Sequence, residues 1–570
     1  MQRENSSRAA VLRRSSQAEV LAPSMINRSK IDRRLFVISG ALVLLLGIPL
    51  VLFFKQASNG HAAVGETSSR QLQTRPNDLP TTASRSSTSA VSNSAADKLL
   101  QSNIDQAIDS SSLANANWGV FVMSVRDGRV LYARDANHSF IPASNMKLYT
   151  TAVALDLLGA DYRWRTSVYA ASRPDKDGTI DGDLRIYGRG APDLVLNVNG
   201  KRSSLKELAD QLYASGVRRV RGNIVGDESY FRAEPLGDGW LWNDVQWYFG
   251  AEASALSVGG NELSLDIAPG AKPGDPARLK LEPDTDFVRI QNDAVTADEG
   301  KPTTIGINRG LSDNSFRIWG DFPAKGRGFR ARLAVHQPAL WFARLFRDEL
   351  FARGIAVDGQ PILRDARGQT ARGRFDPQHE IELASLSSRS LGEITRSINK
   401  ESLNLEAELV LRTLGKEKGE TAPEPDPRKA ANRGDDEAGL AVIRLWLQQS
   451  GISTEGIALH DGSGLSRLDF VTPEATARLL ASMWTKSAGA IFRDSLPIAG
   501  RDGTLQNRMR TTRASIYAKT GTLNYVNSLS GYIVSDDKEI LAFSIICNND
   551  ISLSTSTLVL DSVARSLANR

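Results

Sequence analysis

The stretch WGVFVMSVRDGRVLYARDA, residues 118–136, joins two apolar, β-rich runs through the dipeptide Asp127-Gly128. Asp-Gly between alternating apolar residues is a strong local signal for a β-hairpin. The far end of the chain holds similar runs (SIYAKT, SLSGYIVS and EILAFSIICN) and then a helical pattern, at residues 515–520, 528–535, 539–548 and 556–570. Strands at both ends of the chain predict an α+β fold, in which one antiparallel sheet is built from both termini and flanked by helices.

The middle of the chain has a different composition. Residues 163–378 contain many short β-rich runs, separated by turns that are rich in Gly, Asp and Pro. This pattern predicts a multidomain chain, with an outer domain at 96–165 and 381–570 and one or two inserted β-rich domains at 166–380. Residues 381–412 return to helical periodicity.

The N-terminal part of the chain carries the signals of a membrane anchor. Residues 1–34 hold eight basic and three acidic side chains, which account for the whole formal charge of +5. Residues 35–54, LFVISGALVLLLGIPLVLFF, are twenty residues without a charge, enough to cross a bilayer as a helix. The positive-inside rule therefore predicts a cytoplasmic tail, one span, a Ser/Thr-rich flexible tether at 55–95 and an extracytoplasmic remainder. A cleaved signal peptide is the alternative, with GHAA at 60–63 as a weak cleavage site.

Composition also limits the partners and cofactors. Because the charges beyond residue 34 sum to zero, nucleic acid is not expected as a partner. The sequence contains no His-Glu-x-x-His motif, and its single cysteine, Cys547, cannot form a cysteine cluster. We therefore predict no metal and no cofactor.

Ser144 and Lys147 are the first candidates for chemistry. A serine three residues before a lysine occurs four times, at Ser144/Lys147, Ser203/Lys206, Ser397/Lys400 and Ser535/Lys538. The first pair differs because its lysine enters an almost wholly apolar helix, on whose face the amine can reach the hydroxyl. A serine at a helix N-terminus also lies where backbone N–H groups can receive an oxyanion. On these grounds alone, a nucleophile with its base and a helix cap with a solvated lysine are equal alternatives.

Lys519-Thr520-Gly521 lies in a predicted strand, within YAKTGTLN at residues 517–524. A protective lysine and a glycine bulge on an edge strand would explain these residues without a function. As a functional element, the lysine and threonine can bind a carboxylate, and Gly521 lets a substrate approach the strand backbone.

A Ser-x-Asn pair occurs at three places that compete for one role. Ser312-Asp313-Asn314 lies in a turn between predicted strands, where asparagine is common. Ser397-Ile398-Asn399 and Ser402-Leu403-Asn404 lie in helical sequence instead. We predict that Ser402 and Asn404 are the functional pair.

Together the three elements form the S-x-x-K, S-x-N and K-T-G set of penicillin-recognising serine enzymes. The chain resembles the low-molecular-mass class C penicillin-binding proteins, which are D-Ala-D-Ala carboxypeptidases and endopeptidases of the penicillin-binding-protein-four type. The resemblance runs from about Ala96 to the C terminus, and it includes the segments NIVGDESYF, GWLWND, INKESLNLEAE, DGSGLSR and LPIAGRDGTL. It implies a transpeptidase/β-lactamase-like domain with further domains inserted between its first and second motifs.

The resemblance implies catalytic roles for five residues. Ser144 is the acylated nucleophile and Lys147 its general base, while Ser402 and Asn404 complete the proton network. A lysine base must be neutral, which burial and a second nearby cation can achieve by lowering its pKa. Lys519 is a candidate for that cation.

The resemblance also implies substrate-binding residues. Lys519 and Thr520 meet the terminal carboxylate, and the N–H groups of Ser144 and Thr522 form the oxyanion hole. The family uses an aspartate, an arginine and an aromatic residue for the charged side chain of the stem peptide. The matching positions are Asp244 in GWLWND, Arg467 in DGSGLSR, and Phe249.

The implied function is that of a serine-type D-Ala-D-Ala carboxypeptidase, DD-endopeptidase or both, with peptidoglycan stem peptides as substrates and β-lactams as covalent inhibitors. Its location would be the outer, periplasmic side of a bacterial cytoplasmic membrane. A β-lactamase-like hydrolase shares the three motifs and is one alternative, although the large insertions argue against it. A non-catalytic protein that binds peptidoglycan or β-lactams is the other.

Overall fold

The computed structural model describes residues 92, 94–196, 203–366, 375–536, 539–552 and 555–570. The expected cytoplasmic tail at 1–34, the span at 35–54 and most of the tether lie outside these residues and stay predictions. Of the helices that the structure describes, none is both long and apolar enough to cross a membrane.

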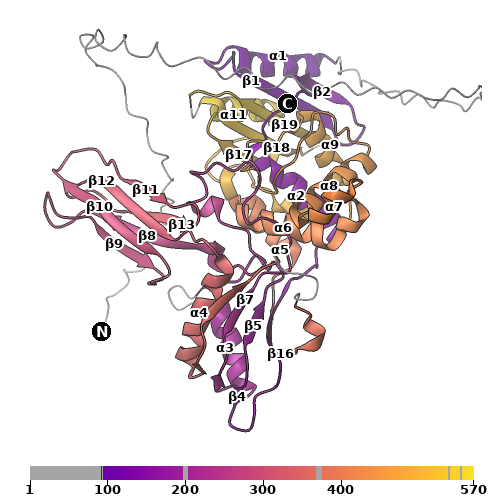
Figure 1. Cartoon of the computed structure of the whole chain (residues 1–570). Coiled ribbons are helices and arrows are strands. Elements are labelled where there is room, and N and C mark those ends of the chain that lie inside the picture. Colours follow the sequence, from indigo (N-terminus) through magenta and orange to yellow (C-terminus); the bar gives the residue numbers. More distant parts are fainter. Residues whose placement is uncertain (1–91, 93, 197–202, 367–374, 537–538, 553–554) are drawn as a thin grey trace, which may run out of the picture. The chain divides into compact units, whose positions relative to one another are not determined.

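One five-stranded antiparallel sheet combines strands from both ends of the chain, in the order β17-β18-β19-β1-β2. Figure 1 shows the indigo strands β1 and β2 continuing the yellow sheet of the C-terminal part. Trp118 of β1 lies opposite Cys547 of β19 in the antiparallel register. The predicted sheet from the two termini is therefore confirmed. Its strands are β1 (Asn117–Ser124), β2 (Val130–Arg134), β17 (Ser515–Leu523), β18 (Val526–Val534) and β19 (Ile540–Asn548).

Side chains of β1 alternate between two apolar layers. Val120 and Val122 join the core that one face of the sheet forms with helices α1 and α11. Phe121 and Met123 join the larger core on the other face, to which helix α9 belongs. A period of two is what a strand covered on both faces requires. The covering helices are α1 (Ala95–Asp109), α9 (Pro473–Trp484) and α11 (Thr555–Ala568).

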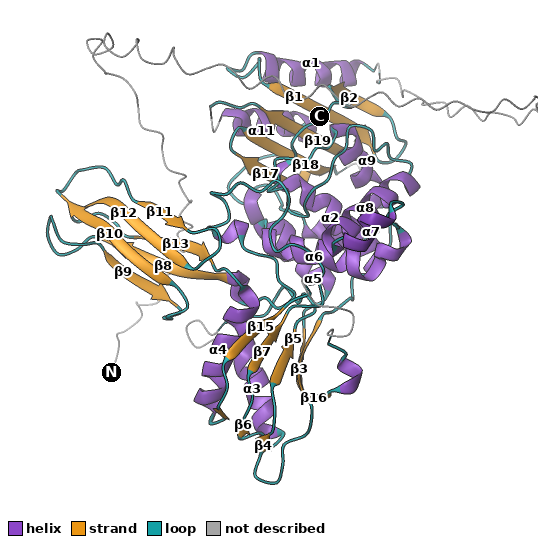
Figure 2. Cartoon of the chain, viewed as in Figure 1, coloured by secondary structure: helices purple, strands orange, loops and turns teal. Residues whose placement is uncertain are grey.

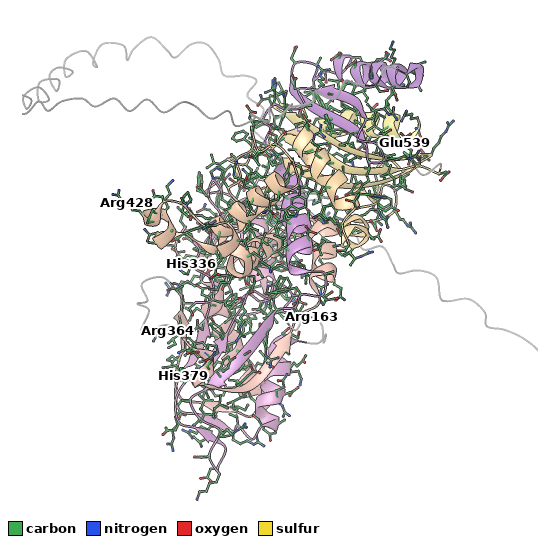
Figure 3. All side chains as sticks on the ribbon, turned by 90° about the vertical axis from the view of Figure 1, so that its right-hand side faces the viewer. Arg163, His336, Arg364, His379, Arg428 and Glu539 are labelled. Atoms are coloured by element: carbon green, nitrogen blue, oxygen red, sulfur yellow. The ribbon has the colours of Figure 1, made fainter. Side chains whose placement is uncertain are left out.

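Four charged side chains tie the first and last elements of this domain together. Arg129, from the β1–β2 turn, and Arg570, at the C terminus, both pair with the buried Asp97 of α1, at 2.7 and 2.6 Å. Both arginines also pair with Glu539, which Figure 3 labels, at 3.2 and 3.0 Å. The N-terminal hairpin and the C-terminal helix are thus held at the same end of the sheet.

Helix α2 (Met146–Leu158) is enclosed by other helices. All residues from Met146 to Leu155 are buried. This cover on every side explains why the helix is apolar all round rather than along one stripe. It also removes the side chain of Lys147 from water. The helices that contact α2 include α5 (Leu391–Glu401), α6 (Asn404–Lys418), α8 (Asp435–Gln449), α9 and α10 (Gly489–Ser495).

The described inserted part of the chain contains four sheets, whose strands Figure 2 shows in orange. A mixed five-stranded sheet, in the order β15-β7-β5-β3-β16, contacts helices α3 and α4. Strands β8 to β13 form two three-stranded sheets, β13-β8-β9 and β10-β12-β11, with no helix between them in the described chain. The second sheet is built from the segment that connects β9 with β13. A small parallel sheet has the order β14-β6-β4.

The bounds of these inserted elements are β3 (Arg165–Ala170), β4 (Thr179–Ile180), β5 (Leu184–Tyr187), α3 (Ser204–Ala214), β6 (Arg219–Val220), β7 (Ile224–Asp227), β8 (Glu262–Ala268), β9 (Arg278–Glu282), β10 (Arg289–Ala297), β11 (Gly306–Arg309), β12 (Ser315–Pro323), β13 (Phe329–Ala334), α4 (Pro338–Arg353), β14 (Ala356–Val357), β15 (Pro361–Arg364) and β16 (Ile381–Ser387).

Strand β16 corrects one prediction. The spacing of apolar residues predicts helix from residue 381 onward, but residues 381–387 form a strand that pairs with β3. The register shifts between Glu382 and Ala384, so a bulge interrupts the period of two. Because of the bulge, the apolar residues of 381–387 no longer alternate strictly with polar ones, and their spacing resembles that of a helix. Helix α5 begins only at Leu391, after the N-cap Ser390.

Helices α6 and α8 approach each other closely at Gly415. A Cβ atom there would lie 1.7 Å from the carbonyl oxygen of Asp435 and 2.6 Å from the amide nitrogen of Gly439. We expect Gly415→Ala to lower the free energy of unfolding by about 1–3 kcal/mol, because the two helices must separate.

The matched control is Gly392→Ala in helix α5, where the added Cβ would meet no atom nearer than 3.3 Å. Alanine is favoured over glycine in a helix, so this variant should be as stable as the parent or more stable. Denaturant unfolding measures both variants. Equal losses of stability in the two would contradict the close helix crossing.

Candidate active site

Ser144 lies in a short, strained turn that is fastened to the sheet. The turn is the 3-10 helix η1 (Ala143–Asn145), directly before α2, and Ala143 adopts a φ of 49°. Asn548 of β19 fixes the residues that lead into this turn. Its side-chain oxygen accepts the N–H of Ile141, and its side-chain nitrogen donates to the C=O of Ile141. Ser528 of β18 donates to the carbonyl of Pro142 at 2.7 Å. Two strands from the C-terminal part of the chain therefore fix the position of the turn that carries Ser144.

The amine of Lys147 contacts three separate segments of the chain. Its Nζ lies 3.0 Å from Ser144 Oγ, 2.6 Å from Asn404 Oδ1 and 2.6 Å from the carbonyl oxygen of Ser463. The side chain is completely buried. A neutral amine has two hydrogens and one lone pair. Asn404 and Ser463 accept the two hydrogens, which leaves the lone pair for the hydroxyl of Ser144.

The charge state of Lys147 is set by opposing effects. Burial lowers its pKa to about 8, although the carboxylates of Asp461, Glu408 and Asp469 raise it. Burial also raises the pKa of Glu408 to about 7 and that of Asp469 well above its usual range. Lys147 is therefore neutral in part near physiological pH, as a base must be.

Lys519 is the second buried amine of the site. Burial lowers its pKa well below the usual range, and the charge of Lys147 lowers it further. Its Nζ donates to Ser402 Oγ at 2.8 Å and to the carbonyl of Thr520 at 2.9 Å. The two lysines repel each other when both are charged, so protonation of one disfavours protonation of the other.

Ser402 and Asn404 stand at the junction of helices α5 and α6. Ser402 ends α5 in the left-handed region, with a φ of 60°, and Asn404 is the first residue of α6. Asn404 accepts from Lys147 through Oδ1 and donates through Nδ2 to the carbonyl of Phe249 at 2.8 Å. The pair thus connects both lysines with the inserted part of the chain.

Strand β17 runs along the nucleophile turn at Gly521. A Cβ at this position would lie 2.2 Å from Ser528 Oγ and 3.0 Å from the amide nitrogen of Ser144. Any side chain would therefore push the strand away from the nucleophile. Thr520 shares a 2.8 Å hydrogen bond with Thr504, and Thr522 is exposed beside them.

Asp244, Phe249 and Arg467 also meet at this site. Burial raises the pKa of Asp244, and the charge of Arg467 opposes this rise. The guanidinium of Arg467 donates to the carbonyl of Asn524, in the turn after β17, at 2.9 Å. The carbonyl of Phe249 accepts from Asn404. The charges of Asp244 and Arg467 therefore influence each other, and Arg467 lies at the turn that follows the Lys519 strand.

The other Ser-x-Asn pairs have structural partners. Asn314 bonds the backbone N–H and C=O of His336, in the turn before β12. Asn399 is buried and donates to Thr151 and to Ser495. Of the three candidates, it is Ser402-Leu403-Asn404 that lies against Lys147 and Lys519.

Three residues that help to form the site are not individually predicted from the sequence. Ser463, Asp461 and Thr504 lie in DGSGLSR and LPIAGRDGTL, segments that the resemblance includes but from which it singles out Arg467 alone. Ser463 acts through its carbonyl, which every residue has, so its side chain carries no signal. Asp461 before a Gly/Ser run is the recognisable mark of a carboxylate-capped loop.

Two of the described histidines form ion pairs with carboxylates and have no contact with Ser144 or Lys147 among the hydrogen bonds given above. His336 and His379, both labelled in Figure 3, pair with Glu252 and Asp376 through Nδ1 at 2.6 and 2.9 Å. Within the described ranges, no group of three or more His, Cys, Asp or Glu side chains is arranged to hold a metal ion.

Comparison with known proteins gives a consistent result. Residues 100–569 match the D-Ala-D-Ala carboxypeptidase 3 (S13) family. The D-alanyl-D-alanine carboxypeptidase of Actinomadura sp. (strain R39) is 35% identical over 482 residues, which cover 82% of this chain and 84% of that protein. The penicillin-sensitive carboxypeptidase A of Dictyostelium discoideum is 26% identical, covering 79% and 86%. The crystal structure of penicillin binding protein 4 (dacB) from Haemophilus influenzae has a TM-score of 0.68 at 22% identity, covering 82% and 98%, and shares the fold.

We expect the amine of Lys147 to titrate with a pKa of about 8, because burial outweighs the nearby carboxylates. It is charged below this pH and neutral above it. NMR of ¹³Cε-labelled lysine measures the value, and Lys147→Ala assigns the signal. Titration at the ordinary lysine value of ~10.4 would show that the amine is solvated and that the described burial is wrong.

Proposed function

Because the chain belongs to the D-Ala-D-Ala carboxypeptidase 3 (S13) family, we propose that it is a serine peptidase that cleaves D-Ala-D-Ala stem peptides of peptidoglycan through an acyl-enzyme on Ser144. The observation that carries the proposal is the buried amine of Lys147, 3.0 Å from the Ser144 hydroxyl. Two acceptors hold its hydrogens and leave its lone pair free for the serine proton.

Acylation follows from these contacts. Lys147 takes the proton of Ser144 as Oγ attacks the carbonyl carbon of the penultimate D-alanine. The N–H groups of Ser144 and Thr522 receive the negative charge that develops on the carbonyl oxygen. The C–N bond to the terminal D-alanine then breaks, and the proton passes to the leaving nitrogen. Ser402, held by Lys519, is placed to relay that proton.

Deacylation repeats the same chemistry with water as the nucleophile. Lys147 accepts a proton from the water, the ester bond to Ser144 breaks, and Ser144 Oγ regains a proton. The amine that is released during acylation determines whether the enzyme is a carboxypeptidase or an endopeptidase. A free D-alanine makes the enzyme a carboxypeptidase, and an amine on a neighbouring stem peptide makes it a DD-endopeptidase.

Lys519 and Thr520 are proposed to hold the carboxylate of the terminal D-alanine. In the described part of the chain, the buried amine of Lys519 donates to Ser402 and Thr520 and to no carboxylate. An arriving carboxylate would raise the pKa of Lys519 and stabilise its charge. Repulsion then favours the neutral form of Lys147, so substrate binding promotes the active state of the base.

Asp244 and Arg467 are proposed to recognise the side chain of the stem-peptide diamino acid, with Phe249 as an aromatic wall. Opposite charges on the two residues suit a side chain that ends in an ammonium and a carboxylate.

β-Lactams are proposed as covalent inhibitors that acylate Ser144. The relative from Dictyostelium discoideum is named for its penicillin sensitivity, which supports this proposal.

We further propose that residues 35–54 anchor the protein in the bacterial cytoplasmic membrane, with residues 1–34 inside and the peptidase domains on the periplasmic side. The uncharged run of twenty residues and its basic flank support this arrangement. Full-length protein should sediment with membranes, and the chain without residues 1–54 should not. Equal solubility of the two would refute the anchor.

We expect Ser144→Ala to abolish labelling by a fluorescent penicillin, because no other hydroxyl lies at Lys147 Nζ in the described contacts. The matched control is Ser397→Ala, which removes the serine of another Ser-x-x-Lys pair whose lysine binds Asp502 instead. This variant should keep the labelling rate of the parent. Gel fluorescence and intact mass measure the adduct.

Two outcomes would count against the assignment. Labelling of Ser144→Ala at the parent rate would place the nucleophile elsewhere. Loss of a parent adduct within seconds would instead indicate a β-lactamase.

A further inference from the structure

We propose that Asp461 is a positioning residue that couples the base Lys147 to the segment that recognises the substrate side chain. The inference deepens the proposed function and rests on it. It concerns the segment from Gly239 to Phe249, which carries Asp244. The structure fastens this segment at one end to Asp461, which shapes the loop of Ser463, and at the other end to Asn404, which bonds Lys147.

The carboxylate of Asp461 shapes the loop that faces Lys147. Oδ1 accepts the N–H groups of Ser463 and Gly464, at 3.0 and 2.6 Å. Oδ2 accepts the N–H of Ser466 at 2.8 Å and the hydroxyl of Ser463 at 3.2 Å. These bonds fold the loop so that the carbonyl of Ser463 reaches Lys147 Nζ at 2.6 Å.

The same carboxylate reaches the recognition segment. Oδ2 of Asp461 accepts the indole N–H of Trp240 at 2.9 Å. The carbonyl of Gly239 accepts the N–H of Arg467 at 3.3 Å, one residue after Ser466. A single buried side chain therefore touches the loop of the base, the neighbour of Arg467 and the start of the segment that carries Asp244.

The far end of the segment has an independent link. Asn404 donates to the carbonyl of Phe249 and accepts from Lys147. Between the two links, the backbone N–H of Asp244 bonds the carbonyl of Leu241 at 2.9 Å and closes a turn. The two links make the position of Asp244 depend on the groups that orient Lys147.

The surroundings of Asp461 are themselves charged. Asp469 Oδ1 accepts the backbone N–H of Asp461, and burial raises the pKa of Asp469. Glu408 accepts the N–H of Gly462 at 2.9 Å and pairs with the buried Arg412 at 3.0 Å. Asp461 is thus the carboxylate that accepts backbone N–H groups on both of its oxygens.

An asparagine at 461 keeps the shape but cannot keep all the bonds. Both oxygens of Asp461 accept N–H groups, whereas an amide has one acceptor and one donor end. In either orientation of the amide, its NH₂ group faces two N–H donors. Asp461→Asn should therefore loosen the base and the recognition segment together, and Trp240→Phe should loosen the segment alone.

The experiment compares two kinds of reaction in the full-length chain, three reactions in all. One reaction is acylation by penicillin, which lacks the diamino side chain. The other is cleavage of two stem peptides that differ only at the diamino acid, one with a zwitterionic side chain and one with norleucine. Thermal unfolding confirms that each variant is folded.

We expect Trp240→Phe to raise KM about tenfold for the zwitterionic peptide, because one bond to a buried carboxylate is lost. Penicillin acylation and norleucine-peptide cleavage should stay within about twofold of the parent. Asp461→Asn should slow all three reactions, by about tenfold or more. The matched control is Trp446→Phe, which removes a 2.8 Å indole bond to Asp156 away from the site and should alter none of them.

Equal effects of Trp240→Phe on all three reactions, or none on any, would overturn the coupling. An Asp461→Asn variant that is folded and acylates at the parent rate would do the same. Failure of the parent to react with penicillin or peptide would instead refute the proposed function, and with it the premise of this inference. The two failures are therefore distinct.

Discussion

The amine of Lys147 must lie out of water and within reach of Ser144, and the rest of the architecture depends on that constraint. Burial lowers the pKa of the amine to about 8. A buried amine without partners would be costly, so Asn404 and Ser463 accept its hydrogens. These partners come from positions more than 250 residues further along the chain. The base is therefore assembled only when the distant segments pack around α2.

The five-stranded sheet of the outer domain holds the catalytic groups in position. Strands from both termini pair in it, and Asn548 and Ser528 hold the turn that carries Ser144. Close contact of β17 with that turn depends on Gly521, which has no side chain to intervene. The inserted part returns to the same site through Phe249 and Trp240. An insertion within the outer domain can thus contribute to recognition without separating the catalytic groups.

Local sequence predicts the parts of this fold that have a local cause. The Asp-Gly turn, the terminal strands and the apolar helix α2 follow from periodicity and turn chemistry. The helical context of Ser402-Leu403-Asn404 distinguishes it from Ser312-Asp313-Asn314. The second of these has the more common Ser-Asp-Asn sequence but lies in a turn near β12. Strand β16 differs from the predicted helix because its bulge breaks the period of two that marks a strand. The carbonyl of Ser463 could not be predicted, since only tertiary packing decides which backbone group faces Lys147.

A crystal structure of the protein after reaction with penicillin tests the central claim most directly. The account predicts continuous density from Ser144 Oγ to the opened lactam carbonyl, whose oxygen lies between the amides of Ser144 and Thr522. The ligand carboxylate should lie on Lys519 and Thr520, and Lys147 should retain its contacts with Asn404 and Ser463. An adduct on any other residue, or a Lys147 amine turned out to solvent, would contradict it.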